Sequence, residues 1–289
     1  MSIGEKVMMI GIIGGTGLYS LDIFDSIEEK TVDTPFGLPS APIVVGRYNS
    51  AQFAFLPRHG SKHELLPSEI NYRANIWALK MVGVKKIVSI SAVGSLVDEV
   101  APGDLALAEQ YFDWTKGTRR GTFFGNGLVA HVSTAEPTCL KLGDRLVVAA
   151  RKSGCELQRS KTYSCVEGPR LGTRAESQFL KSAGCHLVGM TNVPDVFLSR
   201  EAQLCYCGLC IVTDYDCWLD DPAKHVTVSQ VMELYCQQLD RVQSVIRELL
   251  AMEIDTGVCS CSNQLAEAVL SKPEQISAEA RKRLEFLKG

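Results

Sequence analysis

Short apolar runs alternate with stretches of helical periodicity along most of this chain. The apolar runs are short enough to be buried strands, and they cover residues 7–13, 42–48, 52–56, 86–91, 163–167, 187–190 and 204–212, with one more near Leu105. The helical stretches cover residues 71–81, 137–152, 173–183, 191–202 and 227–252. Strands that alternate with helices predict an α/β fold with a largely parallel β-sheet that helices cover.

Local signals refine this pattern. Thr173 with Glu176, and Thr227 with Gln230, have the spacing of capping boxes that start helices. Residues 42–56 predict a β-hairpin, and residues 111–132, rich in Gly and Thr, predict a long loop. We find no repeat, low-complexity run or linker. We therefore predict one domain over residues 1–254 and a helical C-terminal extension, residues 255–289, packed on or beside it.

Polar residues follow the apolar run of residues 204–212. Thr213 ends the predicted strand, and Asp214 and Asp216 follow at a spacing that puts both carboxylates on one side of an extended chain. Ligands of open α/β sheets bind beyond the carboxyl ends of strands, and two acids there suit a base with an amino group and a ring nitrogen. One acid could exchange a proton with that nitrogen if burial or the other acid raises its pKa. The alternative is a solvated turn in which Asp caps the next element.

Two further segments have the chemistry of anion sites. Gly14, Gly15 and Gly17 surround Thr16 after the first strand, and such a turn can cradle phosphate with its amides. A plain tight turn or a dinucleotide-binding loop are the alternatives, although Ser stands where the latter needs its third Gly. Arg58 precedes His59, with His63 close by, and this group predicts an oxyanion site or else a basic surface turn.

Composition narrows the class of protein. The 289 residues are 46% hydrophobic and 22% charged, with a formal net charge of −3. These values are ordinary for a globular protein and give no indication of nucleic-acid or membrane binding. No apolar run approaches the roughly 20 residues of a membrane-spanning helix, and residues 1–6 lack the pattern of a secretory signal. We expect a cytoplasmic enzyme or binding protein.

Eleven cysteines are many for a cytoplasmic chain. Cys205, Cys207 and Cys210 loosely resemble a metal-binding set, but a strand would divide them between its two faces. We therefore expect buried thiols that behave as small hydrophobic side chains rather than a zinc site.

A set of short motifs occurs in order along the chain: GGTGLY, TPFG, PRHG, NYRANIWALK, AVGS, PGD, AEP, VEGPR, TRAES, GMTNVP and TDYDCW. This ordered set resembles the methylthioadenosine phosphorylases of the trimeric purine nucleoside phosphorylase family, and the match as a whole runs from residue 10 to about residue 250. The resemblance implies a single α/β domain in which helices cover both faces of a twisted, mixed and largely parallel β-sheet. It also implies a pentosyltransferase of purine and methionine salvage. In its reaction, phosphate attacks the anomeric carbon of methylthioadenosine and releases adenine and 5-methylthioribose 1-phosphate.

The same resemblance implies partners and site residues. It implies a homo-oligomer, a trimer or a dimer of trimers, with nucleoside and inorganic phosphate as substrates and neither a metal nor an organic cofactor. The residues implied to bind phosphate are Thr16, Arg58, His59, Ser91 and Thr191. The residues implied to contact ribose or base are Ala92, Met190, Leu171, Val188, Thr213, Asp214 and Asp216, with the two acids in the catalytic role. Leu171 replaces a family Phe that stacks on the base.

The 5′ group of the substrate has its own implied pocket. Val228 and Val231 lie on one face of the helix that starts after Thr227, and His131 is implied to reach this pocket from a neighbouring subunit. The alternative is that the two valines only pack the helix into the core. Rival functions are a phosphorylase of 6-oxopurine nucleosides or methylthioinosine, whose family members carry an amide at the position of Asp214, and a non-catalytic nucleoside-binding protein.

Cys259 and Cys261 lie in a tail like those of some disulfide-bearing archaeal relatives. Because disulfides are rare inside cells other than those of hyperthermophiles, we predict that both are free thiols.

Overall fold

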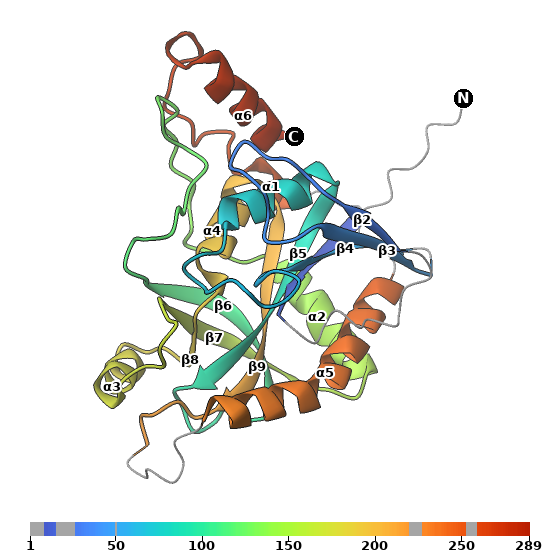
Figure 1. The fold of residues 1–289 in the computed structure, drawn as a ribbon, viewed down its shortest axis with the longest axis vertical. Helices are drawn as coiled ribbons and strands as arrows, with labels where there is room; N and C mark the ends of the chain where they lie inside the picture. Colours follow the sequence, from blue (N-terminus) through green and yellow to red (C-terminus); the bar gives the residue numbers. More distant parts are fainter. Residues whose placement is uncertain (1–8, 16–26, 50, 220–226, 253–258) are drawn as a thin grey trace.

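The computed structural model describes residues 9–15, 27–49, 51–219, 227–252 and 259–289 (Figure 1). Its strands are β1 (Met9–Gly14), β2 (Ile27–Lys30), β3 (Ile43–Tyr48), β4 (Ala51–Pro57), β5 (Val84–Ser95), β6 (Leu105–Trp114), β7 (Leu157–Val166), β8 (Leu187–Gly189) and β9 (Cys205–Asp214). The α-helices are α1 (Tyr72–Met81), α2 (Leu140–Lys152), α3 (Arg174–Ser182), α4 (Asn192–Glu201), α5 (Val228–Ala251) and α6 (Ala278–Lys288). Two short 3₁₀ helices, η2 (Ser260–Asn263) and η3 (Pro273–Gln275), precede α6.

The strands form one mixed sheet in the order β2-β3-β4-β1-β5-β8-β7-β6-β9. Within the described residues, five of its pairings are parallel and four are antiparallel. The mixed character agrees with the sequence-based expectation, and β3 and β4 form the predicted hairpin.

Part of this sheet closes on itself, which the sequence did not predict. Strand β9 pairs in parallel with β5 and antiparallel with β6, so β5, β8, β7, β6 and β9 form a ring of paired strands. The expected twisted sheet did not include this closure, and this part of the molecule is a small barrel. Closure needs an antiparallel contact between β6 and β9, which are far apart in the chain.

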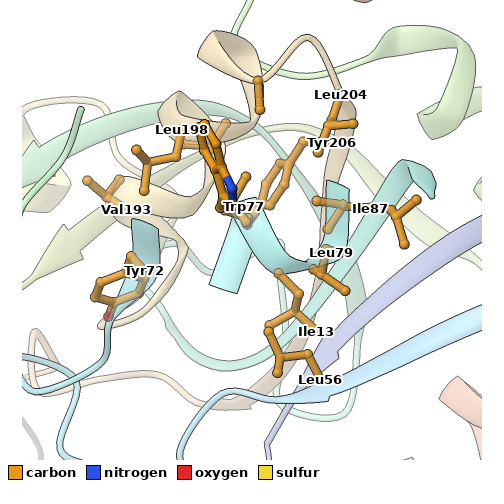
Figure 2. Packing of buried hydrophobic residues seen from close by; sticks show 14 of the residues in the cluster. Ile13, Leu56, Tyr72, Trp77, Leu79, Ile87, Val193, Leu198, Leu204 and Tyr206 are labelled. Atoms are coloured by element: carbon orange, nitrogen blue, oxygen red, sulfur yellow. The ribbon is translucent and has the colours of Figure 1, made fainter. Parts of the chain in front are cut away.

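Helices cover two faces of the sheet. Helices α1 and α4 lie on one side, and Figure 2 shows Trp77 of α1 close to Leu198 of α4 and Tyr206 of β9. Helices α2 and α5 pack together on the other side, where Leu146 and Val242 are buried with Leu209 of β9. Strand β9 thus contributes side chains to both cores, because successive residues of a strand point to opposite faces.

Both predicted capping boxes are present. At the start of α3, the backbone amide of Glu176 donates a hydrogen bond to the Thr173 hydroxyl. At the start of α5, the backbone amide of Gln230 donates one to the Thr227 hydroxyl. The second box fixes the first turn of α5, from which Val228 and Val231 border a cavity.

The C-terminal segment packs against α1 and α4. Phe286 of α6 stacks on Trp77 with ring centroids 4.2 Å apart. The ammonium group of Lys80 donates to the carbonyls of Ala202 and Leu287, at 2.7 and 2.8 Å. The predicted domain boundary at residue 254 falls in residues 253–258, outside the described part, and stays a prediction.

Several boundaries differ from those expected. Strand β6 continues to Trp114, because its pairing with β7 runs to Val166, so the predicted loop over residues 111–132 begins later. Strand β2 was not predicted. Its pairing with β3 identifies it, and its sequence Ile-Glu-Glu-Lys contains no apolar run. No helix among the described residues is long and apolar enough to span a membrane.

Candidate active site

A cavity of about 420 Å³ opens at the carboxyl ends of the parallel strands β1, β4, β5 and β9. Gly15 follows β1, Arg58 follows β4, and Asp214 ends β9; all three line the cavity. Its size is within the range of small-molecule sites, about 300–1,000 Å³. Its position at strand ends is where α/β proteins bind ligands.

Asp214 is buried, with 8% of its surface exposed, and both its oxygens are hydrogen-bonded. The Thr213 hydroxyl donates to Oδ2, and the amide of Asp216 donates to Oδ1, each at 2.7 Å. Burial raises the pKa of Asp214, these two hydrogen bonds lower it, and the charge of Asp216 raises it further. The net shift is upward, as the sequence argument required of an acid that transfers a proton.

The geometry of the two acids differs from the prediction. Strand β9 ends at Asp214, and Asp216 has a left-handed backbone conformation with φ of 51°. The chain is therefore not extended between them, and the turn rather than strand alternation brings both to the cavity. The alternative of a solvated turn is wrong for Asp214, because its side chain is buried.

Arg58 is only 1% exposed and is the largest fully buried side chain among the residues that the structure describes. Several groups hold it in place. Its Nη1 donates to the carbonyl of Ile90 at 3.1 Å, and its Nη2 donates to the hydroxyl of Ser89. Its Nε lies 3.7 Å from Oδ2 of Asp195, which is also buried. A guanidinium group has five N–H donors, so these contacts orient it and leave capacity for a ligand in the cavity.

His59 lines the cavity next to Arg58 as a neutral imidazole. Burial and the neighbouring charge of Arg58 lower its pKa to about 4. Its Nδ1 lies 2.9 Å from the carbonyl of Leu65, so the neutral ring donates there and leaves Nε2 as an acceptor. The His63 ring stacks on it at 4.6 Å and also lines the cavity.

Nearly all the other predicted site residues that the structure describes line the same cavity. These are Ser91, Ala92, Leu171, Val188, Met190, Thr191, Thr213, Val228 and Val231. Ser91 and Thr191 are buried, whereas Leu171 is half exposed. The cavity therefore collects residues from several separate segments of the chain.

Val228 and Val231 form the wall contributed by α5. Val228 is 64% exposed, so the alternative that it packs the helix into the core is wrong. Met232 and Tyr235 line the same wall and were not predicted. Helical spacing could have found them, because each lies four residues after one of the two valines.

Two predicted residues are not seen in this cavity. His131 is exposed, does not line it, and donates its amide to the carbonyl of Ala268 at 2.9 Å. Its implied role in a neighbouring subunit stays a prediction. Thr16 lies outside the described residues.

Sequence reasoning missed Asp195 and Ser89, the groups that hold Arg58. Asp195 lies in the first turn of α4, where an acid has an ordinary explanation as a partner of the helix dipole. Ser89 precedes Ser91 by two residues, on the same face of β5. Neither position gives a sequence signal for a contact with a buried Arg58.

The comparisons with known proteins agree with this geometry. A model of the phosphorylase superfamily matches residues 9–251. The chain belongs to this superfamily. The S-methyl-5'-thioadenosine phosphorylase of Geobacter sulfurreducens is 41% identical to this phosphorylase-superfamily chain over 281 residues, which are 97% of this chain and 98% of that protein. The protein of the same name from Thermofilum pendens is 43% identical over 266 residues, 92% of this chain and 100% of that one.

Solved structures of other superfamily members have the same fold. A methylthioadenosine phosphorylase from an Antarctic soil metagenomic library superposes with a TM-score of 0.91 at 39% identity, covering 98% of this chain and 99% of that one. A mutant of the adenosine/methylthioadenosine phosphorylase of Schistosoma mansoni, in complex with methylthioadenosine, gives a TM-score of 0.79 at 38% identity, covering 84% of this chain and 91% of that one.

Proposed function

We propose that this chain catalyses the phosphorolysis of 5′-methylthioadenosine to adenine and 5-methylthioribose 1-phosphate. The observation that carries the proposal is the convergence of a buried acid of raised pKa, Asp214, and a buried cation, Arg58, on one cavity. In this reaction phosphate forms a bond to the anomeric carbon while the bond to N9 of adenine breaks. The leaving base becomes anion-like, and a proton supplied at N7 neutralises it.

Asp214 fits the role of the group that supplies this proton. Its raised pKa keeps a fraction of the carboxyl protonated closer to neutral pH than an ordinary Asp. Each carboxyl oxygen has more than one hydrogen-bonding site, so the contacts from Thr213 and Asp216 can persist when a purine binds. A carboxyl group that donates to N7 and accepts from the 6-amino group matches adenine, whereas an amide there would serve a 6-oxo group.

Arg58 and His59 fit the phosphate end. Arg58 brings the positive charge, and its contacts with Ser89, Ile90 and Asp195 fix the guanidinium before the ligand arrives. Neutral His59 can accept a hydrogen bond at Nε2 from a phosphate hydroxyl. Hydroxyl donors from β5 and the start of α4 also line the cavity. Phosphate held against the cation-like ribose stabilises the transition state, an effect worth a few kcal/mol per contact.

The α5 wall fits a methylthio group rather than a hydroxyl. Tyr235 brings a hydroxyl to this wall, but the side chains of Val228, Val231 and Met232 carry no hydrogen-bond donor. A ribose 5′-hydroxyl placed against these three side chains would lose its water without a partner, at a cost of about 1–3 kcal/mol. A methylthio group loses nothing comparable and gains from burial.

We further propose a homo-oligomer, a trimer or a dimer of trimers, that works in the cytoplasm and needs neither metal nor organic cofactor for the reaction. Large apolar side chains at the cavity support the assembly, because Leu66, Leu171, Val228 and Met232 are all more than 40% exposed in the single chain. A neighbouring subunit would cover such side chains. Sedimentation equilibrium of the purified protein tests the assembly, and a monomeric mass would contradict it.

The function itself is tested by following base release. The purified protein is incubated with methylthioadenosine, adenosine, inosine and methylthioinosine, each with and without inorganic phosphate. We expect phosphate-dependent release of adenine, fastest from methylthioadenosine. Preference for the two 6-oxo substrates would favour the rival 6-oxopurine phosphorylase. Binding of nucleosides without release of base would favour a non-catalytic binding protein.

A further inference from the structure

Four cysteines converge at a point that is separate from the cavity. They are Cys139, the N-cap residue of α2, Cys205, the first residue of β9, and Cys259 and Cys261 at η2. Their sulfur atoms all lie within 4.8 Å of one another. Cys139, Cys205 and Cys261 are buried and Cys259 is half-buried, so the cluster is almost closed to solvent.

The spacing of these sulfur atoms is that of a tetrahedral metal site. In such a site, with zinc–sulfur bonds of about 2.3 Å, neighbouring sulfur atoms are about 3.8 Å apart. The sulfur atoms of Cys139 and Cys259 are 3.7 Å apart. None of the four is joined in a disulfide in the structure, so all four sulfur atoms can serve as ligands. The redox state of Cys259 and Cys261 stays a prediction. Four sulfur ligands without any oxygen ligand select zinc over calcium or magnesium.

The surroundings suit the charge of such a site. Four thiolates around one Zn²⁺ carry a net charge of −2, which needs positive partners when it is buried. The guanidinium of Arg200 places Nη1 3.6 Å from the sulfur of Cys261, and Gln264 Oε1 accepts from Nη2 at 2.7 Å and holds it in position. The N-terminus of α2 at Cys139 adds the favourable end of a helix dipole.

We propose that Cys139, Cys205, Cys259 and Cys261 bind one zinc ion in a closed, structural site. When zinc binds, each cysteine that is still a thiol releases its proton to solvent, and each of the four sulfur atoms forms one bond to the metal. No oxidation state changes. The ion joins the segment around η2 to α2 and to the first residue of β9. It therefore ties the C-terminal segment to the sheet. The proposal is independent of the reaction proposed above.

The set of cysteines that loosely resembled a metal site in the sequence, Cys205, Cys207 and Cys210, shares only Cys205 with this cluster. Cys207 and Cys210 are its neighbours in sequence, yet they are not in the cluster, and Cys210 packs into the core on the opposite face of β9. The true neighbours come from segments that only the fold brings together.

Metal content and its ligand shell test this proposal. The full chain is produced in zinc-supplemented medium and purified with a phosphine reductant. Elemental analysis should give about one zinc per chain, and X-ray absorption should give a shell of four sulfur atoms at about 2.3 Å. Loss of even an outer hydrogen-bonding partner weakens metal binding about 10-fold or more. Because Cys261 is a direct ligand, we expect Cys261→Ser to bind zinc about 10-fold more weakly or worse, measured by dialysis against a competing chelator.

Cys236→Ser is the matched control, because Cys236 is exposed on α5 and outside the cluster, and it should keep its zinc. If Cys261→Ser does not fold, the X-ray absorption spectrum of the wild-type protein still tests whether four sulfur atoms bind the zinc. Three results would overturn the proposal: a folded wild-type protein that takes up no added zinc, a ligand shell with nitrogen or oxygen in place of sulfur, or a non-reducing peptide map with disulfides among the four cysteines. Equal zinc loss from both variants would also overturn it.

Discussion

An ideal Cβ atom built on Gly94 would lie 3.0 Å from Oδ1 of Asp214. The same atom would lie 3.1 Å from Cβ of Asp216 and 3.2 Å from Val188. Gly94 pairs with Asp214 across the β5–β9 ladder, at an irregularity in its register. The absence of a side chain at Gly94 is therefore what lets the acidic turn approach β5.

Gly94→Ala should displace Asp214 by several tenths of an ångström, because its neighbours on this side are packed. A misplacement of about 1 Å can cost about 100-fold in rate, so we expect kcat/KM for methylthioadenosine to fall about tenfold. Gly143→Ala is the control, since a Cβ there would meet no atom closer than 3.7 Å. Steady-state kinetics of both variants check the prediction. Unchanged kinetics of Gly94→Ala would mean that the exact position of Asp214 does not matter.

Asp214→Asn should shift the base preference from 6-amino toward 6-oxo purines. The variant keeps the size and burial of the side chain but cannot supply a proton to N7. We expect kcat for methylthioadenosine to fall about 100-fold, which is within the usual contribution of an acid catalyst. The ratio of methylthioinosine to methylthioadenosine activity should rise. Wild-type activity and preference in the variant would show that Asp214 does not have this role.

The raised pKa of Asp214 also predicts the pH dependence of the reaction. The active form of an acid catalyst is protonated, so kcat/KM should fall as the pH rises through the pKa of Asp214. Because burial shifts this pKa upward, the fall should occur at higher pH than an ordinary Asp would give. The pH profile of Asp214→Asn should lack this limb. A profile with the same limb in the variant would assign it to another group.

Local sequence signals selected residues that the fold brings to one cavity, but they did not indicate how the sheet closes. Asp214 was selected because an apolar run ends there, and Arg58 because a strand precedes a basic segment. The closure of the barrel depends on β6 pairing with β9, and nothing in either strand specifies an antiparallel partner. Asp195 was missed for a similar reason, because its contact with Arg58 joins distant segments and both side chains have ordinary local explanations.

Arg58→Ala should raise the KM for phosphate about 10- to 100-fold, because a hydrogen bond to a charged group is worth about 1.5–3 kcal/mol. The KM for methylthioadenosine should change much less. Arg47→Ala, at an exposed position on β3 that does not line the cavity, removes an equal charge and serves as the control. Thermal unfolding must show that Arg58→Ala folds, because Asp195 loses its partner. A parallel increase of both KM values would indicate general disruption of the cavity.

Val228→His should move the 5′ preference toward adenosine. Val228 is the first residue of α5, lies 64% exposed and borders the cavity, so the larger side chain can be accommodated without disturbing the core. A histidine there can hydrogen-bond a 5′-hydroxyl, which Val228 leaves without a partner. In the wild type we expect kcat/KM to favour methylthioadenosine over adenosine by roughly 10- to 200-fold.

The variant should lower that ratio by raising the activity with adenosine, and the measurement is kcat/KM for both substrates on the same preparation. Ser229→His is the matched control, because Ser229 is the next residue of the helix, is exposed and does not line the cavity. It should leave the ratio unchanged. An equal loss of kcat/KM with both substrates in Val228→His would show that α5 closes the cavity without discriminating between the 5′ groups.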